Sequence, residues 1–501
     1  NNIGHKNISN NQNNNNVYNN NLPNNFTKEQ QQQLYNMMLQ NSSLLVNMTP
    51  FINQHLQNIN FNNNINNPQM SNLLSNLNNA NINPFNNSFY FQNSYQYYYQ
   101  IFYNYWSDEN NLLSNLRNNL LNNHSSNYHN NINYINNKCE KLKEKYNYLK
   151  EIQKKNPSCI KEFTTLFEEK IILPVYTKIN EENQIKKKVY TEVYNKYKNI
   201  IMTILSKHGM QDTQIEPYGS IVNNFMTEWG DIDICIIPKD NNLIQSFWEY
   251  LEEIKNEAVN VQKCAYLDLL ERYPRFLILK MKDIEKNIDL DITVQNILPI
   301  LNTKLIRLYS LLDQRFHIFG IFLKFWVKKN HIHGALDKFL TSYALLILII
   351  HYLQNITEPK ILPILQQVEN IKKEYKYHFE EKELTANIYF EEDLGKINNY
   401  MSIINDKKEN NSTVVELLIG FFEFYAYKYD HYLISISRSD KKPVEEDETA
   451  AFPIEDPFDI NYNPGKSMKL NTIYYSAFIY CMKKELNNIL FGEYFKFGTG
   501  E

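Results

Sequence analysis

The sequence predicts an α+β protein with two lobes, in which a small mixed sheet is followed by a mainly helical lobe and preceded by a disordered leader. Three observations support this prediction. β-Branched runs of strand length alternate with polar turns between residues 214 and 294. Beyond Leu301, apolar residues recur at helical spacing almost to the end of the chain. Asparagine dominates residues 1–135, which carry almost no charge.

Composition limits the classes of function. The chain has 501 residues, of which 43% are hydrophobic, enough for a sizeable core. With 51 basic and 55 acidic residues it has no global basic excess, so local clusters must hold any polyanion. The 5 cysteines lie far apart without a C-x-x-C pair, which argues against a zinc module or a disulfide framework. We therefore expect an intracellular protein, and within the cell we favour the cytoplasm.

No apolar run in this sequence reaches the length of a membrane span. The most apolar stretch, Tyr343 to Leu353, is too short to span a bilayer and indicates a buried helix, so we expect no membrane partner. The first residue is Asn rather than Met, so we expect a fragment of a longer protein.

The elements follow in order. Residues 1–135 are the leader, which could recruit a partner. Residues 136–212 are predicted to form lead-in helices that pack on the helical lobe, because apolar residues keep a helical period there. The segment 213–302 is the sheet, and 303–495 is the helical lobe. Within these segments we predict helices at 139–155, 160–172, 181–208 and 241–256, strands at 214–218, 232–237, 260–266, 275–282 and 288–294, and polar loops near 356–360, 405–412 and 439–452.

The stretch from Tyr218 to Pro238 carries the chemistry. Side chains alternate along a strand, so Asp231 and Asp233 project from one side while the isoleucines between and after them enter the core. Adjacent carboxylates repel each other, and a hard cation such as Mg²⁺ relieves this. One Asp-x-Asp is expected by chance in a chain of this length, but the later strand-like run IDLDITV supplies Asp289 and Asp291 in the same pattern.

A glycine-serine pair precedes these acids. Gly219 lets the backbone approach a bulky anion, and Ser220 places a hydroxyl and an N–H at a helix start, where phosphate is favoured. This indicates a nucleoside triphosphate whose metal is held by Asp231 and Asp233.

The helical lobe adds candidates that have simpler interpretations. Lys324 and Lys328 lie four residues apart on one helical face and could clamp a triphosphate, although most such pairs are merely solvated. Ser342 could contact a phosphate or could cap a helix. Tyr343 could stack on a base or could belong to the core.

Five segments in order resemble the template-independent RNA nucleotidyltransferases of the polymerase-β-like superfamily. The resemblance is closest to the branch with a PAP-associated domain, which contains terminal uridylyltransferases and cytoplasmic-type poly(A) polymerases. It covers roughly residues 160 to 495 and leaves out the leader. It implies that 213–302 is the catalytic domain and 303–495 the nucleotide-recognition domain. The segments are GS(x)₁₀DID, DITVQN, LKFWVKKN…LTSYALLILIIHYLQ, LLIGFFEFYAYKY and IEDPFDINYNPGK.

The resemblance assigns roles to single residues. Asp231, Asp233 and Asp291 are the carboxylates expected to bind two Mg²⁺ or Mn²⁺ ions. Asp291 is preferred to Asp289 because it begins the DITVQN segment, and it could assist deprotonation of the RNA 3′-hydroxyl. The remaining matches are Asn302 for the ribose 2′-hydroxyl, Lys324, Lys328 and Ser342 for phosphates, and Tyr343 for base stacking.

Base choice is where this sequence departs from the pattern. Asp456, the acidic residue associated with base recognition, is retained. Tyr462 stands where uridylyl-adding members have a His, and Lys466 stands where they have an Arg. A tyrosine is neutral near pH 7 and can hydrogen-bond to either base. We favour UTP, with ATP as the alternative.

The predicted activity is therefore addition of UMP, or AMP, to an RNA 3′ end. Two other functions stay open: a catalytically silent RNA-binding scaffold, and a synthetase that makes oligonucleotides from NTP without a primer. We expect a monomer that holds RNA weakly between the lobes through its last nucleotides, because a basic excess is missing.

Overall fold

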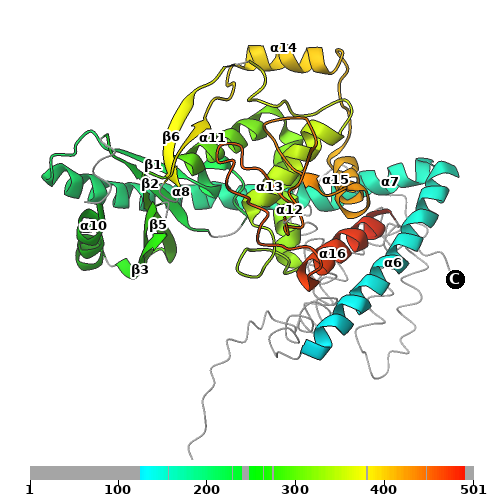
Figure 1. Ribbon diagram of the computed structural model, residues 1–501, viewed down its shortest axis with the longest axis horizontal. Helices are drawn as coiled ribbons and strands as arrows, with labels where there is room; N and C mark the ends of the chain where they lie inside the picture. The colour runs from blue at the N-terminus through cyan, green and yellow to red at the C-terminus, as the bar shows by residue number, and fades with distance from the viewer. Residues whose placement is uncertain are drawn as a thin grey trace, which may run out of the picture. The chain divides into compact units, whose positions relative to one another are not determined.

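The computed structural model describes residues 125–490, with gaps at 156, 228–229, 240–246, 263, 273–275, 370, 380–381 and 447. These residues all belong to one compact unit, in which a small sheet is followed by a helical region (Figure 1). The α+β prediction is therefore confirmed. Disorder is predicted for the leader over residues 1–135, but residues 125–135 instead begin a helix, Ser125–Lys155, and the rest of the leader lies outside the described residues.

A five-stranded mixed sheet forms the first lobe. Its spatial order is β1-β2-β5-β4-β3, and all neighbouring pairs are antiparallel except β2 and β5, which are parallel. The connection between β1 and β2 contains α9, and the connection between β2 and β3 contains α10. The elements are β1 (Gln214–Tyr218), α9 (Ser220–Asn223), β2 (Ile232–Ile237), α10 (Phe247–Gln262), β3 (Cys264–Arg272), β4 (Phe276–Asp283) and β5 (Ile288–Val294).

The two faces of the sheet have different roles. Alternate residues of β2 and β5 join a buried apolar cluster with α10 and with the C-terminal half of α8 (Leu173–Lys207). On the opposite face Cys235 packs with Tyr218 and with Ile300 of α11 (Ile297–Leu312). The acidic residues of both strands alternate with the buried isoleucines, so they lie on this second face.

Helices make up most of the second lobe. The N-terminal α6 runs alongside α16 (Figure 1), and Asn487 donates a hydrogen bond to the carbonyl of Leu142 at 3.2 Å. At the centre, Trp326 is buried against Phe422 and Phe478. The helices not yet given are α6 (Ser125–Lys155), α7 (Pro157–Phe167), α12 (Gln314–Lys329), α13 (Ser342–His351), α14 (Leu394–Ile404), α15 (Val414–Glu423) and α16 (Ile473–Leu490), and the strands are β6 (Glu374–Phe379), β7 (Lys382–Asn387), β8 (Tyr432–Leu433) and β9 (Lys442–Pro443).

Several predicted elements differ from the structure. The expected strand at 260–266 begins only at Cys264, because Leu251, Ile254 and Ala258 bury one helical face and carry α10 to Gln262. The break expected before residue 181 is absent, since Pro174 lies in the first turn of α8, where its missing N–H is harmless. The β6–β7 hairpin lies in a lobe that we expected to be mainly helical, and no strands were predicted there.

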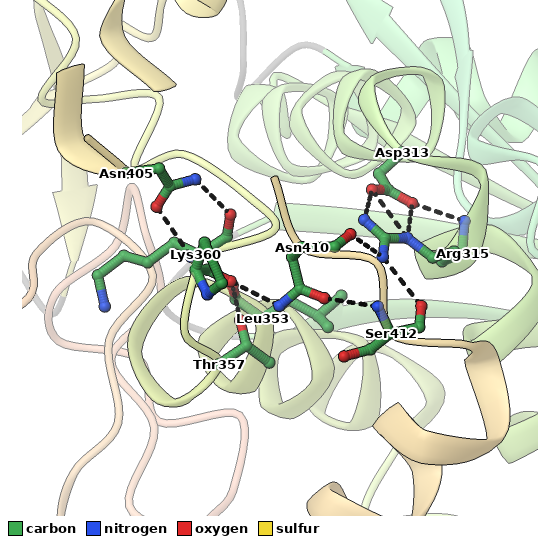
Figure 2. A network of polar contacts seen from close by, with 9 residues as sticks. Asp313, Arg315, Leu353, Thr357, Lys360, Asn405, Asn410 and Ser412 are labelled. Carbon is green, nitrogen blue, oxygen red and sulfur yellow. Dashed lines mark hydrogen bonds and ion pairs between the residues drawn. The ribbon is translucent and has the colours of Figure 1, made fainter. Parts of the chain in front are cut away.

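The loop after α14 is tied to the helical lobe by a polar network (Figure 2). The guanidinium of Arg315 contacts the carboxylate of Asp313 at 2.7 Å and donates to the carbonyls of Asn410 and Ser412 at 2.7 and 3.0 Å. Asn405 exchanges two hydrogen bonds with the backbone of Lys360. These bonds satisfy backbone groups that the loop would otherwise leave unpaired.

No helix in the described ranges is both long and apolar enough to cross a membrane. In the same residues, the cysteines whose surroundings are described, Cys139, Cys235 and Cys481, are buried free thiols.

His351 predicts how stability depends on pH. It is 3% exposed, and burial lowers its pKa from 6.5 to about 3, with a smaller contribution from Lys441. The unfolded chain takes up a proton near pH 6.5 and the folded chain does not, so this stability is present above 6.5 and is lost as the pH falls toward 3. We expect a loss of about 2 kcal/mol in the free energy of unfolding between pH 7 and 5.

Urea unfolding of the wild type and of His351→Gln at both pH values measures this effect. The substitution should lower stability at pH 7, because His351 hydrogen-bonds with the Tyr425 hydroxyl at 2.9 Å. It should also make the change between pH 7 and 5 smaller. An equal acid sensitivity in both proteins would show that another group is responsible.

Candidate active site

Three carboxylates meet on the α11 face of the sheet. Asp233 of β2 lies directly opposite Asp291 in the parallel register with β5, and Asp231 immediately precedes β2. One oxygen from each carboxylate lies within 4.8 Å of the others. Oxygen ligands at this spacing suit Mg²⁺ or Mn²⁺, which would also relieve the repulsion between them. The structure thus brings together the three acids that the sequence singled out.

The surroundings of Asp233 disfavour its ionised form. Burial raises the pKa of Asp233 well above its ordinary value, and the negative charges of Asp231 and Asp291 raise it further. The ammonium of Lys280, on β4, contacts the carboxylate of Asp291 and opposes this shift. A divalent cation between the acids would hold all three ionised.

Gly219 fits closely against the carboxylates. Its φ of 81° and ψ of −156° are accessible in practice only to glycine. A Cβ atom there would lie 2.1 Å from the Oδ2 atom of Asp233. The Gly219 N–H donates to the hydroxyl of Thr303, on α11, at 3.0 Å. Ser220 begins α9, and its Oγ atom would lie 3.7 Å from a Cβ added to Gly230, so it lies beside the residue that precedes Asp231.

A polar cluster continues along α11 into the helical lobe. Asn302 donates from Nδ2 to the carboxylate of Asp456 at 3.1 Å, and the Tyr343 hydroxyl donates to the same oxygen at 2.8 Å. The backbone N–H groups of Phe458 and Asp459 complete the set at 3.0 and 2.9 Å. Asp456 is only 2% exposed, and burial raises its pKa. It is therefore a fixed acceptor that positions both Asn302 and Tyr343.

The other amide atom of Asn302 suits a ligand. Its Oδ1 atom is buried and finds no hydrogen-bond donor among the described residues. Buried acceptors are almost always satisfied in folded proteins, so an open one in this position fits a ligand donor such as a ribose hydroxyl.

The start of α13 shows which residue caps the helix, a question that the sequence left open. Thr341 is the N-cap, and its hydroxyl accepts from the N–H of Ala344 at 3.2 Å. Capping therefore does not require Ser342, whose hydroxyl instead hydrogen-bonds to Nε2 of His333 at 3.0 Å. This leaves the predicted phosphate contact of Ser342 possible.

The two lysines of α12 differ in their surroundings. Lys324 is 4% exposed, and its ammonium donates to the carbonyl of Phe225, in the loop that leads from α9 into β2. Phe225 is itself buried against α12, since a Cβ added to Gly320 would lie 2.4 Å from its ring. Lys328, one turn later, is half-buried. Lys324 thus anchors the loop before Asp231, a role that we did not predict.

The residues predicted to choose the base lie close together. The N–H of Tyr462 donates to the carbonyl of Asp459 at 2.9 Å, and its own carbonyl accepts from the N–H of Asp456 at 3.3 Å. The ammonium of Lys466 lies 5.3 Å from the centre of the Tyr462 ring, a cation–π contact. Tyr462 and Asp456 are therefore coupled through the backbone.

The sequence predictions missed Lys280, Thr303 and His333. For Lys280 a signal existed, because KMK and DLD face each other with equal spacing once β4 and β5 are paired. Thr303 and His333 carry no comparable pattern, since their partners are distant in the sequence or depend on loop geometry.

Two segments of the chain match known protein families. Residues 172–311 match the family described as "Poly(A) RNA polymerase, mitochondrial-like, central palm domain". Residues 413–462 match "Cid1 family poly A polymerase". The first match contains the three carboxylates and Asn302, and the second contains Asp456 and Tyr462.

Individual relatives carry both kinds of name. Human terminal uridylyltransferase 7 is 26% identical over 275 residues, and the alignment covers 53% of this chain and 18% of the relative. Human poly(A) RNA polymerase GLD2 is 27% identical over 259 residues, covering 48% and 49%. The Drosophila melanogaster gld-2 homolog B is 26% identical over 272 residues, covering 48% and 19%. The chain thus spans half or less of the length of these relatives.

Solved structures show the same fold. A structure of the Cid1 poly(U) polymerase, a mutant bound to MgATP, has a TM-score of 0.52 at 23% identity and covers 67% of this chain and 97% of that one. A second Cid1 structure has a TM-score of 0.51 at 22% identity, covering 65% and 92%. Residues 172–311 and 413–462 thus match a poly(A) RNA polymerase palm domain and a Cid1-family poly(A) polymerase domain, and the chain is similar to proteins named poly(A) RNA polymerases and terminal uridylyltransferases.

Proposed function

We propose that this protein adds ribonucleotides from NTP to the 3′-hydroxyl of RNA without a template, with UMP favoured. The observation that carries the proposal is the convergence of Asp231, Asp233 and Asp291 within 4.8 Å on one face of the sheet. Catalysis of phosphoryl transfer depends mainly on positioning and on neutralising charge, and this arrangement supplies both when divalent cations are bound.

The chain's own residues then have distinct roles. The 3′-oxygen attacks the α-phosphorus, pyrophosphate leaves, and the hydroxyl proton passes to the carboxylate of Asp291. Gly219 leaves room for the triphosphate beside Asp233. Lys328 and Ser342 contact its phosphates, while Lys324 also holds the loop before Asp231. We include Mg²⁺ or Mn²⁺, two per site, as part of this proposal.

The nucleoside is held by the cluster around Asp456. The open Oδ1 atom of Asn302 accepts from the ribose 2′-hydroxyl, which favours ribonucleotides. The hydrogen bond from Tyr343 to Asp456 fixes the phenol, so that its ring presents a face for base stacking. An intracellular location is consistent with the buried free thiols and completes the proposal.

Primer extension tests the activity. The purified protein is incubated with a 5′-labelled oligoribonucleotide, Mg²⁺ or Mn²⁺, and each NTP in turn. Stepwise extension supports the proposal, and product formed from NTP alone would indicate a primer-independent synthetase. RNA binding without any extension, under either metal, would identify a silent scaffold and refute the proposal.

Tyr462 gives a specific prediction about the base. A phenol hydroxyl can donate or accept and so distinguishes uracil from adenine weakly. We expect Tyr462→His to raise the ratio of UTP to ATP incorporation by about tenfold, the effect of one redirected hydrogen bond. Competition between labelled UTP and ATP measures the ratio, with Tyr462→Phe as the control that keeps the ring. A clear preference of the wild type for ATP would overturn the choice of UMP.

A further inference from the structure

Lys280 occupies an unusual position on the sheet. It lies on β4 directly opposite Asp291 of β5, and its ammonium contacts the Oδ2 atom of that carboxylate. Asp291 belongs to the group of three acids whose oxygens lie within 4.8 Å of one another. A side-chain cation is therefore held against the same carboxylate that is expected to bind a metal ion.

A second ion pair on the same two strands provides a comparison. Lys282 lies opposite Asp289 at 3.3 Å, two residues further along and on the same face. The Asp289 side chain is 53% exposed, against 20% for Asp291, and it does not belong to the group of three acids. The two pairs share strands, register and residue types. Only the Lys280 pair includes a member of the group of three acids.

We propose that Lys280 is a tethered counter-cation that holds Asp291 in place in the metal-free protein and leaves it when a divalent cation binds. This inference rests on the proposed function, because it requires the carboxylates to bind metal. Lys280 is thus a positioning residue, acting through Asp291 rather than on the substrate.

Charge balance supports this role. When all three are ionised, the carboxylates carry three negative charges in a small volume, and Lys280 offsets one of them. The ammonium of Lys280 can also move away from Asp291 into water, because the side chain is 30% exposed and has a long stem. A lysine that stayed in place would repel a divalent cation a few ångströms away, which weakens metal binding.

Metal binding tests the role directly. Lys280→Met keeps most of the length of the side chain and removes its charge, Lys282→Met is the matched control, and Lys280→Arg keeps the charge. Mn²⁺ binding without nucleotide is followed by the electron paramagnetic resonance signal of free Mn²⁺, and thermal unfolding is measured in EDTA. Asp233→Asn reports whether the Mn²⁺ is bound at the carboxylates.

Lys280→Met should bind Mn²⁺ about fivefold more tightly than the wild type and should unfold at a lower temperature in EDTA. Lys282→Met should match the wild type in both measurements, and so should Lys280→Arg. Equal Mn²⁺ affinity in the two Met variants, or weaker binding in Lys280→Met, would overturn the inference alone. Wild-type protein without Mn²⁺ binding that depends on Asp233 would overturn the proposed metal site and this inference with it.

Discussion

Asp233→Asn is expected to abolish primer extension and, in the same protein, to raise thermal stability when no metal is present. Burial and the charges of Asp231 and Asp291 raise the pKa of Asp233 in the folded chain. Its ionised form therefore opposes folding at neutral pH, above the unfolded value of 3.8. The neutral amide has almost the same shape and removes that repulsion, and it also removes one of the charged carboxylates that we propose as metal ligands.

We expect extension to fall by about a thousandfold or more. A metal ion at this site would lower the free energy of the charged transition state by several kcal/mol, and the substitution weakens its binding. The midpoint of unfolding in EDTA should rise by about 2 to 4 °C, corresponding to about 1 kcal/mol. Differential scanning calorimetry with and without Mg²⁺ measures the second effect. Added Mg²⁺ should stabilise the wild type and leave Asp233→Asn unchanged.

Asp289→Asn is the control. Asp289 also lies on β5, but it pairs with Lys282 and is not one of the three acids that lie together. It should keep both extension and the response to Mg²⁺. If Asp233→Asn unfolded at a lower temperature than the wild type in EDTA, the carboxylate would be stabilising the fold, and our account of its electrostatics would be wrong.

The acids could be found from the sequence because strand alternation is a local rule. Asp231 and Asp233 share a side whatever the rest of the chain does, and so do Asp289 and Asp291. The pairing of Asp233 with Asp291 is different, because it depends on β2 and β5 being parallel neighbours. Nothing within either strand specifies its neighbour. The prediction that the three acids meet therefore rested on the resemblance.

Contacts between lobes show the same limit more strongly. Asn302 and Asp456 are 154 positions apart, and their hydrogen bond depends on how α11 meets an irregular segment of the helical lobe. The contact of Lys324 with the loop before Asp231 could not be predicted for a related reason. Helical spacing placed it on one face with Lys328, but only the fold brings the carbonyl of Phe225 to its ammonium.

Gly219→Ala is expected to disable the site without unfolding the protein. The added Cβ atom would lie 2.1 Å from the Oδ2 atom of Asp233, so the carboxylate must move. A shift of about 1 Å in a catalytic group lowers activity by about a hundredfold. We expect a loss of this size in extension, together with weaker Mn²⁺ binding, because the displaced carboxylate is one of the three that we propose as metal ligands.

Gly209→Ala separates this effect from backbone strain. Gly209 also has a positive φ, 74°, but a Cβ atom there meets nothing within 4 Å. Both substitutions should lower the free energy of unfolding, by about 1 kcal/mol or more, because an L residue is strained at positive φ. Only Gly219→Ala should change extension and Mn²⁺ affinity. If Gly219→Ala kept wild-type values of both, Asp233 would not need its present position, and the three carboxylates would not form the site that we propose.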